Sequence, residues 1–165
     1  MKLKVIILFL VSLNSFTFFA QLSPQFPQEL DALIKANFAQ VKGKSKGYDK
    51  TLKGEVFSTD YKISDFKIKA VEVSFTENFI LAEYTKKGDD ALMDDLFNQT
   101  MTLPYNRYDS KNNPLLLSDA EKEKGVIRKI EIRKRFGSNS GTANLLAEIT
   151  LDNAGKIVIR FTTKY

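Results

Sequence analysis

The C-terminal part of the chain, residues 126–165, decides the fold, and it reads VIRKIEIRKRFGSNSGTANLLAEITLDNAGKIVIRFTTKY. Apolar and polar residues alternate in the segments 126–136, 143–151 and 157–165, and this period of two is typical of strands with one buried face. The stretches GSNSG and DNAG between these segments are typical of turns. The sequence therefore predicts a three-stranded antiparallel meander with one face in solvent.

The first strand of the meander separates apolar from charged side chains. Successive side chains of a strand point to opposite faces, so one face is expected to be buried and the other to be basic. A register slip of one residue would bury cations without partners, and this cost fixes the orientation. The expected buried residues are Val126, Ile130, Ile132 and Phe136, and the expected solvent-facing residues are Lys129, Glu131, Arg133 and Arg135.

Three further strands and two helices are expected before the meander. Strand patterns occur at 55–63, 66–75 and 78–86. Apolar residues at helical spacing follow Ser23, and this helix is expected to end at Gly43. A second helix is expected to begin after Gly88 and to end at Pro104, with acidic residues in its first turn. The polar segment 104–121 is expected to be an irregular loop.

These patterns predict one α+β domain over residues 21–165, in which two helices pack on one face of an antiparallel β-sheet in the order αβββαβββ. Isolated pairs of strands are weak, so the helices are needed to cover the apolar face of the sheet. The sequence contains no convincing internal repeat.

The N-terminal residues 1–20 are typical of a secretory signal peptide. Lys2 and Lys4 precede a strongly apolar run that ends in Phe-Phe-Ala, and cleavage is expected after Ala20. Phe18 departs from the usual pattern, because a small residue is expected there. The sequence therefore predicts an exported protein, periplasmic or secreted, whose mature form starts at Gln21.

The composition excludes several classes of enzyme. The chain has no Cys, no His and no Trp. The chain therefore cannot form disulfides, use a thiol nucleophile, bind a metal through Cys or His, or use a Ser-His-Asp triad. No cofactor and no metal is expected. Any activity would have to use carboxylates, Lys, Tyr or Ser.

The positive charge of the chain is concentrated near its C-terminus. The formal net charge is +5, but residues 122–165 carry 10 Lys and Arg against 4 Asp and Glu, whereas residues 21–121 carry 13 against 16. An overall basic character is therefore a poor argument for nucleic-acid binding, and no nucleic-acid partner is expected.

Two motif-like stretches are better explained without a ligand. Gly43-Lys44-Ser45 resembles the end of a phosphate-binding loop, but Phe38 stands where that loop needs Gly, and a helix rather than a strand precedes it. The acidic cluster Asp89, Asp90, Asp94 and Asp95 has the spacing for a calcium ligand pair, yet further oxygen ligands are not identifiable. The simpler interpretation is a capped, solvated helix start.

The basic face of the C-terminal strands is the best candidate for a functional surface. Lys129, Arg133 and Arg135 are expected to project together, joined by Arg160 and Lys164 from the last strand. Outside the cytoplasm such a face suits an anionic glycan, a lipid headgroup or an acidic protein. The alternative is a solubilising face without a ligand.

The sequence as a whole predicts an exported, soluble binding or interaction module that uses this face, rather than an enzyme. Two alternatives stay open. One is a small hydrolase that uses carboxylates such as Glu72, Glu83 or Glu148, and the other is a membrane-associated component of the envelope.

Overall fold

The computed structural model describes residues 22–74, 77–104, 107–135 and 145–162. Four sequence predictions lie outside these residues: the signal peptide at 1–20, the burial of Phe136, the turn at 137–141 and the exposure of Lys164.

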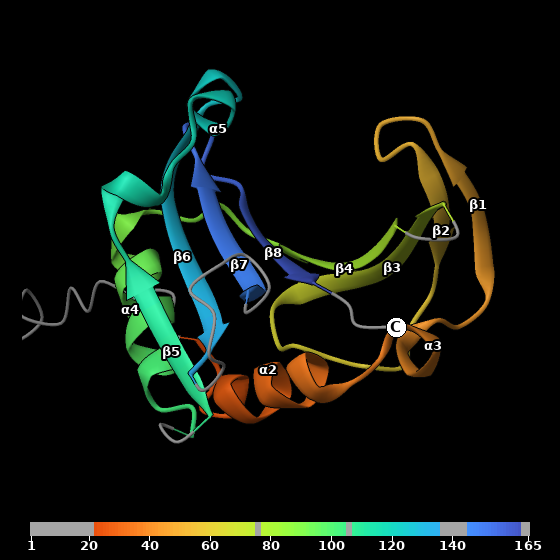
Figure 1. The fold of residues 1–165 in the computed structure, drawn as a ribbon, viewed down its shortest axis with the longest axis horizontal. Coiled ribbons are helices and arrows are strands. Elements are labelled where there is room, and N and C mark those ends of the chain that lie inside the picture. Colours follow the sequence, from red (N-terminus) through yellow and green to blue (C-terminus); the bar gives the residue numbers. More distant parts are fainter. Residues whose placement is uncertain (1–21, 75–76, 105–106, 136–144, 163–165) are drawn as a thin grey trace, which may run out of the picture.

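The described chain forms one sheet of eight antiparallel strands in the order β1-β2-β3-β4-β8-β7-β6-β5. The strands β1 and β5 are the two edges of the sheet. Figure 1 shows that the sheet is bent, with β1 and β2 rising at one end and β6 and β7 at the other. The strands are β1 (Ser45–Asp49), β2 (Gly54–Phe57), β3 (Phe66–Ser74), β4 (Glu77–Tyr84), β5 (Tyr108–Asn112), β6 (Val126–Lys134), β7 (Leu145–Asp152) and β8 (Ile157–Thr162).

Helices are few and short in the described residues. They are α2 (Phe26–Lys35), α3 (Phe38–Val41), α4 (Asp90–Met101) and α5 (Asp119–Glu123), with one turn of 3-10 helix, η1 (Pro114–Leu116). Helix α2 lies below the sheet in Figure 1, and α4 contacts β5 and β6.

The predicted order αβββαβββ with two helices is wrong. The described residues form eight strands and four helices in the order ααββββαβαβββ. The antiparallel meander of the C-terminal third is confirmed, because β6 pairs with β7 and β7 pairs with β8. The errors lie in the two edge strands and in the short helices.

The two strands that the sequence patterns did not predict, β1 and β5, are polar and lie at the edges of the sheet. The sequence of β1 is SKGYD, with every side chain exposed except the half-buried Asp49. The sequence of β5 is YDSKN, in which only Tyr108 is buried. An edge strand with little buried surface needs no apolar alternation, so the pattern that finds inner strands does not find these. The predicted loop at 104–121 therefore contains β5, η1 and the start of α5.

The expected first helix is interrupted between α2 and α3. The chain is extended at Ala36 and Asn37, and the Asn37 side chain accepts a hydrogen bond from the Gln40 N–H at 2.9 Å. The Gln40 side chain accepts in return from the Asn37 N–H, so a capping box starts a new helix. The apolar spacing from Leu30 to Val41 continued through this break, which is why the sequence suggested one helix.

The main core lies between the sheet and helices α2, α3 and α4. Side chains of α2 such as Phe26 and Leu30 are fully buried, as are Met93 and Leu96 of α4. The burial of Ile130 and Ile132 predicted from the sequence is confirmed. The sheet contributes Ala70, Ile80, Ala82, Ile130, Ile132, Ala147, Ile149, Ile159 and Phe161 to this core.

A second, smaller apolar cluster lies on the other face of the sheet. It consists of Val71, Phe79 and Leu81, with Leu52, Val56, Val73 and Val158 packed against it. Val56 and Leu52 belong to β2 and to the turn before it, so the bend of the sheet brings the β1–β2 end onto the face of β3 and β4. This cluster anchors the end of the sheet that carries β1.

Candidate functional site

The face of the sheet opposite α2 and α4, beyond the small apolar cluster, is lined by charged side chains. We call it the charged face and define it by Lys69, Glu83, Lys129, Glu131, Arg133, Glu148 and Arg160. The strand register places Lys69 opposite Leu81, Leu81 opposite Arg160, Arg160 opposite Glu148, and Glu148 opposite Glu131. Directly paired residues of neighbouring strands are close enough to interact, so this is one continuous row of side chains.

Lys129 lies inside this row and is not exposed. The Lys129 side chain is 7% exposed, and its ammonium group lies 2.7 Å from Glu148, 2.9 Å from Glu121 and 3.5 Å from Glu131. The predicted exposure of Lys129 is therefore wrong, and so is that of Glu131, which is 5% exposed, although the predicted alternation of the strand is right. Helix α5 supplies Glu121, and no pattern in the sequence indicates that this helix covers the strand.

The contacts within the cluster shift the pKa values of Lys129 and Glu121 towards their charged forms. Burial lowers the pKa of Lys129, but hydrogen bonds to Glu148 and Glu121 outweigh burial and raise it. Burial raises the pKa of Glu121, but the hydrogen bonds it accepts from Lys129 and Ser118 outweigh burial and lower it to about 2. The buried ammonium of Lys129 is thus surrounded by carboxylates, and a buried cation requires such partners to offset its loss of hydration.

Glu121 makes the cluster sensitive to acid. Its pKa is lower in the folded protein than in the unfolded chain, so its contribution to stability is complete above about pH 4.5 and is lost as the pH falls towards about 2. We expect the wild-type protein to lose about 1 kcal/mol more of its free energy of unfolding over this range than Glu121→Gln does. Urea unfolding at several pH values measures this, and parallel curves for the two proteins would contradict it.

The other predicted cations of this face also have partners. The Arg133 guanidinium lies 2.6 Å from Glu131, and Arg160 lies 4.0 Å from Glu77 with its guanidinium 4.1 Å from the ring centre of Phe79. Arg135 is half-buried and follows β6. The structure thus brings Lys129 and Arg133 to one carboxylate, Glu131, and places Arg160 on the same face two strands away. Lys164 lies outside the described residues.

The glutamates considered as catalytic groups are bound to lysines. Glu72 lies 2.6 Å from Lys42, and Glu148 lies 2.7 Å from Lys129. Glu83 bridges Lys69 and Lys156 at 3.1 and 2.9 Å. Burial raises the pKa of Glu83, but these two lysines outweigh burial and lower it, which is the opposite of what a general acid near neutral pH needs.

The acidic cluster at the start of α4 is accounted for by the fold. Asp89 is the N-cap and accepts a hydrogen bond from the Leu92 N–H at 2.8 Å. Asp90 and Asp94 both bind Arg128 of β6, at 3.3 and 2.7 Å. The described residues contain no group of three or more His, Cys, Asp or Glu placed to hold a metal ion. The interpretation as a capped helix start agrees with these contacts, but the sequence did not predict the role of Arg128 or the hydrogen bond that Asp95 accepts from the Leu22 N–H.

Cations without a carboxylate partner are concentrated elsewhere, on the hairpin of β1 and β2. We call residues 44–57 the basic hairpin, after Lys44, Lys46, Lys50 and Lys53, which are all exposed. None of these four makes an ion pair within the described part of the chain, as the salt bridges found there show.

The two acids of the basic hairpin are used in local hydrogen bonds. Asp49 accepts from the N–H groups of Thr51 and Leu52 at 2.8 and 3.1 Å and so holds the turn, and Glu55 accepts from the Ser45 hydroxyl at 2.5 Å. Neither acid binds a lysine of the hairpin. The clustering of five lysines in 42–54 was visible in the sequence, but only the structure separates Lys42, which is paired, from the other four.

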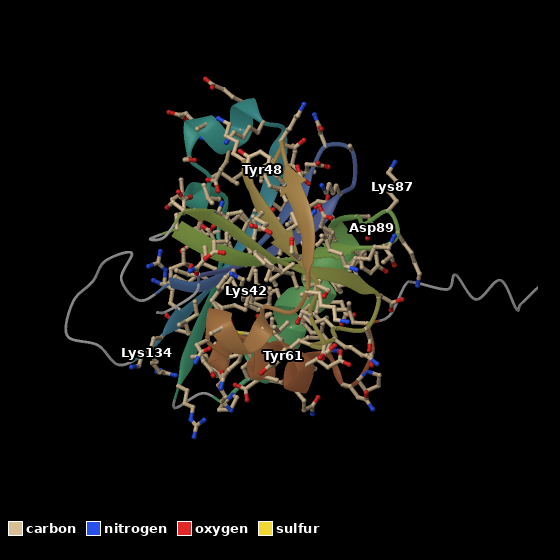
Figure 2. The ribbon with its side chains drawn as sticks, turned by 90° about the vertical axis from the view of Figure 1, so that its right-hand side faces the viewer. Lys42, Tyr48, Tyr61, Lys87, Asp89 and Lys134 are labelled. Carbon is tan, nitrogen blue, oxygen red and sulfur yellow. The ribbon has the colours of Figure 1, made fainter. Side chains whose placement is uncertain are left out.

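An exposed aromatic ring lies in the middle of this basic hairpin. Tyr48 is 68% exposed, and within the described residues every other Phe and Tyr is buried or half-buried. Figure 2 looks onto the β1 end of the molecule and shows Tyr48 on the strand nearest the viewer, apart from Lys87 and Lys134 at the margins. The hairpin therefore combines exposed cations with an exposed ring.

Comparison with known protein families, with curated proteins and with solved structures finds no match to this chain. Within the described residues, the structure contains no helix of the length and apolar character needed to cross a membrane. The functional argument therefore depends on the charges and contacts described above.

Proposed function

We propose that the protein is an exported binding module that recognises an anionic partner through the basic hairpin. The proposal is supported by one observation: the cations of one surface have carboxylate partners, whereas those of another surface do not. Lys129, Arg133 and Arg160 on the charged face have carboxylate partners, whereas Lys44, Lys46, Lys50 and Lys53 have none in the described chain. A cation without an intramolecular partner is free to attract a ligand anion.

Binding is favoured over hydrolysis by the state of the carboxylates. A carboxylate that acts as a general acid needs an apolar site that raises its pKa. The glutamates that border the sheet core are instead bound by lysines, as Glu72 by Lys42 and Glu83 by Lys69 and Lys156.

Export is proposed from the N-terminal sequence, and the start of the described fold is compatible with it. Leu22 is 5% exposed, and its N–H donates to the Asp95 side chain at 3.3 Å. Cleavage after Ala20 would leave this anchoring residue and all the described contacts in the mature protein.

A variant of the four free lysines tests the proposed function. Lys44, Lys46 and Lys50 are changed to Ser, and Lys53, whose φ of 52° favours a residue that tolerates the left-handed region, is changed to Asn. Binding to two polyanions, polygalacturonate and poly-L-glutamate, is measured by titration at low salt. We expect binding to be about 30-fold weaker than for the wild type and to lose most of its salt dependence.

The matched control removes the same number of charges elsewhere. Lys62, Lys87, Lys111 and Lys134 are exposed and make no ion pair within the described residues, and each is changed to Ser. We expect this control to bind within about threefold of the wild type, because scattered charges contribute little at a distant site. Equal weakening in both variants, or no binding of either polymer by the wild type, would refute the proposed function.

A further inference from the structure

The ligand of the basic hairpin must match cations that are spread along a strand. Lys46 lies in β1, and Lys44 and Lys50 lie just before and just after it. A strand rises about 3.3 Å per residue, so the backbone positions of these cations are spread over up to about 20 Å. A single phosphate or headgroup is normally held by cations that converge on one point. An extended anion with repeated charges fits the basic hairpin better.

The free edge of β1 is unsuited to pairing with another strand. Its register with β2 is interrupted between Ser45 and Gly47, and Gly47 has a φ of 94°. Bulges and lysines on an edge strand disfavour addition of an extended peptide by backbone hydrogen bonds. The partner is therefore recognised by side chains, which argues against an acidic protein segment that would add as a ninth strand.

Tyr48 gives the basic hairpin a feature that a polypeptide anion would not use. The ring is 68% exposed and lies on β1, an edge strand of the described sheet, with a lysine two residues away on either side. An exposed ring offers a flat apolar surface at little entropic cost, and it suits a ligand that has ring faces of its own. A polymer with both repeated carboxylates and repeated rings is an acidic polysaccharide.

We infer that the basic hairpin binds an acidic polysaccharide of the uronate type, with the lysines pairing with its carboxylates and Tyr48 stacking on a sugar ring. This inference rests on the proposed function and names the class of its ligand. Tyr48 contributes through its ring, so a phenylalanine at this position is expected to work equally well.

The test compares polygalacturonate with poly-L-glutamate, which carries carboxylates but no sugar rings. We expect Tyr48→Ala to weaken binding to polygalacturonate about tenfold and to leave binding to poly-L-glutamate unchanged, while Tyr48→Phe keeps wild-type affinity for both. Because the Tyr48 side chain is exposed, we expect each variant to fold like the wild type, and circular dichroism of each variant is the measurement that checks this.

The two proposals fail in distinguishable ways. If the variant lacking the four lysines loses binding but Tyr48→Ala weakens both polymers equally or neither, the basic hairpin binds anions and the polysaccharide inference is wrong. Tighter, Tyr48-dependent binding of single-stranded DNA than of polygalacturonate would also overturn it, because lysines with a stacking ring serve that ligand too. Loss of lysine dependence would overturn the proposed function itself.

Discussion

Lys129→Met should destabilise the protein by about 3 kcal/mol, measured by urea unfolding at pH 7. The methionine side chain has a similar volume, so the change removes the charge and leaves the packing nearly intact. In the wild type, Glu121 and Glu148 lie 2.9 and 2.7 Å from the Lys129 ammonium, and the buried Glu131 lies beside them. After the substitution these three carboxylates surround a site that has lost its central cation. Removing one partner of a buried ion pair lowers the free energy of unfolding by more than the intact pair contributes to it, because the remaining charge stays desolvated.

A neighbouring lysine and a second substitution serve as controls for this prediction. Lys134 lies on the same strand but is exposed, so Lys134→Met should change the free energy of unfolding by no more than about 0.5 kcal/mol. Adding Glu148→Gln to Lys129→Met removes one of the carboxylates left without its cation and should recover about 1 kcal/mol. A Lys129→Met protein as stable as the wild type would show that the cluster is solvated and contributes little.

Gly88→Ala should destabilise the protein by about 2 kcal/mol through overpacking. Gly88 precedes α4, and a Cβ added there would lie 2.3 Å from Cδ1 and 2.6 Å from Cγ1 of Ile157. Ile157 is fully buried in the main core, so its side chain has no free volume to move into. The Gly88 N–H donates to the Gly155 carbonyl at 2.7 Å, which holds the two segments together and prevents the backbone from moving apart.

A double-mutant cycle isolates this contact. Ile157→Ala alone should cost about 3 kcal/mol because it leaves a cavity in the core. In the Ile157→Ala background, however, the further change Gly88→Ala should cost less than about 1 kcal/mol, since the clashing atoms are gone. If Gly88→Ala costs the same in both backgrounds, the cause is the backbone conformation at Gly88 and not the contact with Ile157.

The inner strands of the sheet were predictable from the sequence, because burial of one face imposes a period of two. The alternation around Ile130 and Ile132 is the clearest case, and both residues are fully buried. The edge strands β1 and β5 were not predictable in this way. They bury little side-chain surface, and their extended conformation is set by hydrogen bonds to β2 and β6 rather than by an apolar pattern.

The candidate site was only partly predictable for a related reason. Periodicity places Lys129 on the correct face, but it says nothing about what covers that face. The carboxylates around Lys129 come from α5, from β6 itself and from β7, and such contacts between elements do not follow from local spacing. The same limit applies to the lysines of 42–54, whose number is plain in the sequence but whose pairing is not.

The position of β8 in the sheet has a consequence for how the chain acquires its structure. Strand β8 is the last strand described, yet it lies between β4 and β7 and pairs residues 158–162 with 79–83. The two halves of the sheet therefore meet only when nearly all of the chain is available, and a contact between such distant residues is slow to form because a long loop must close first. A chain emerging from the ribosome would hold unpaired edges at β4 and β7 until residues 157–162 had been synthesised. Late completion of this kind would suit the export proposed above, because a chain that is threaded across a membrane must stay unfolded until it has crossed.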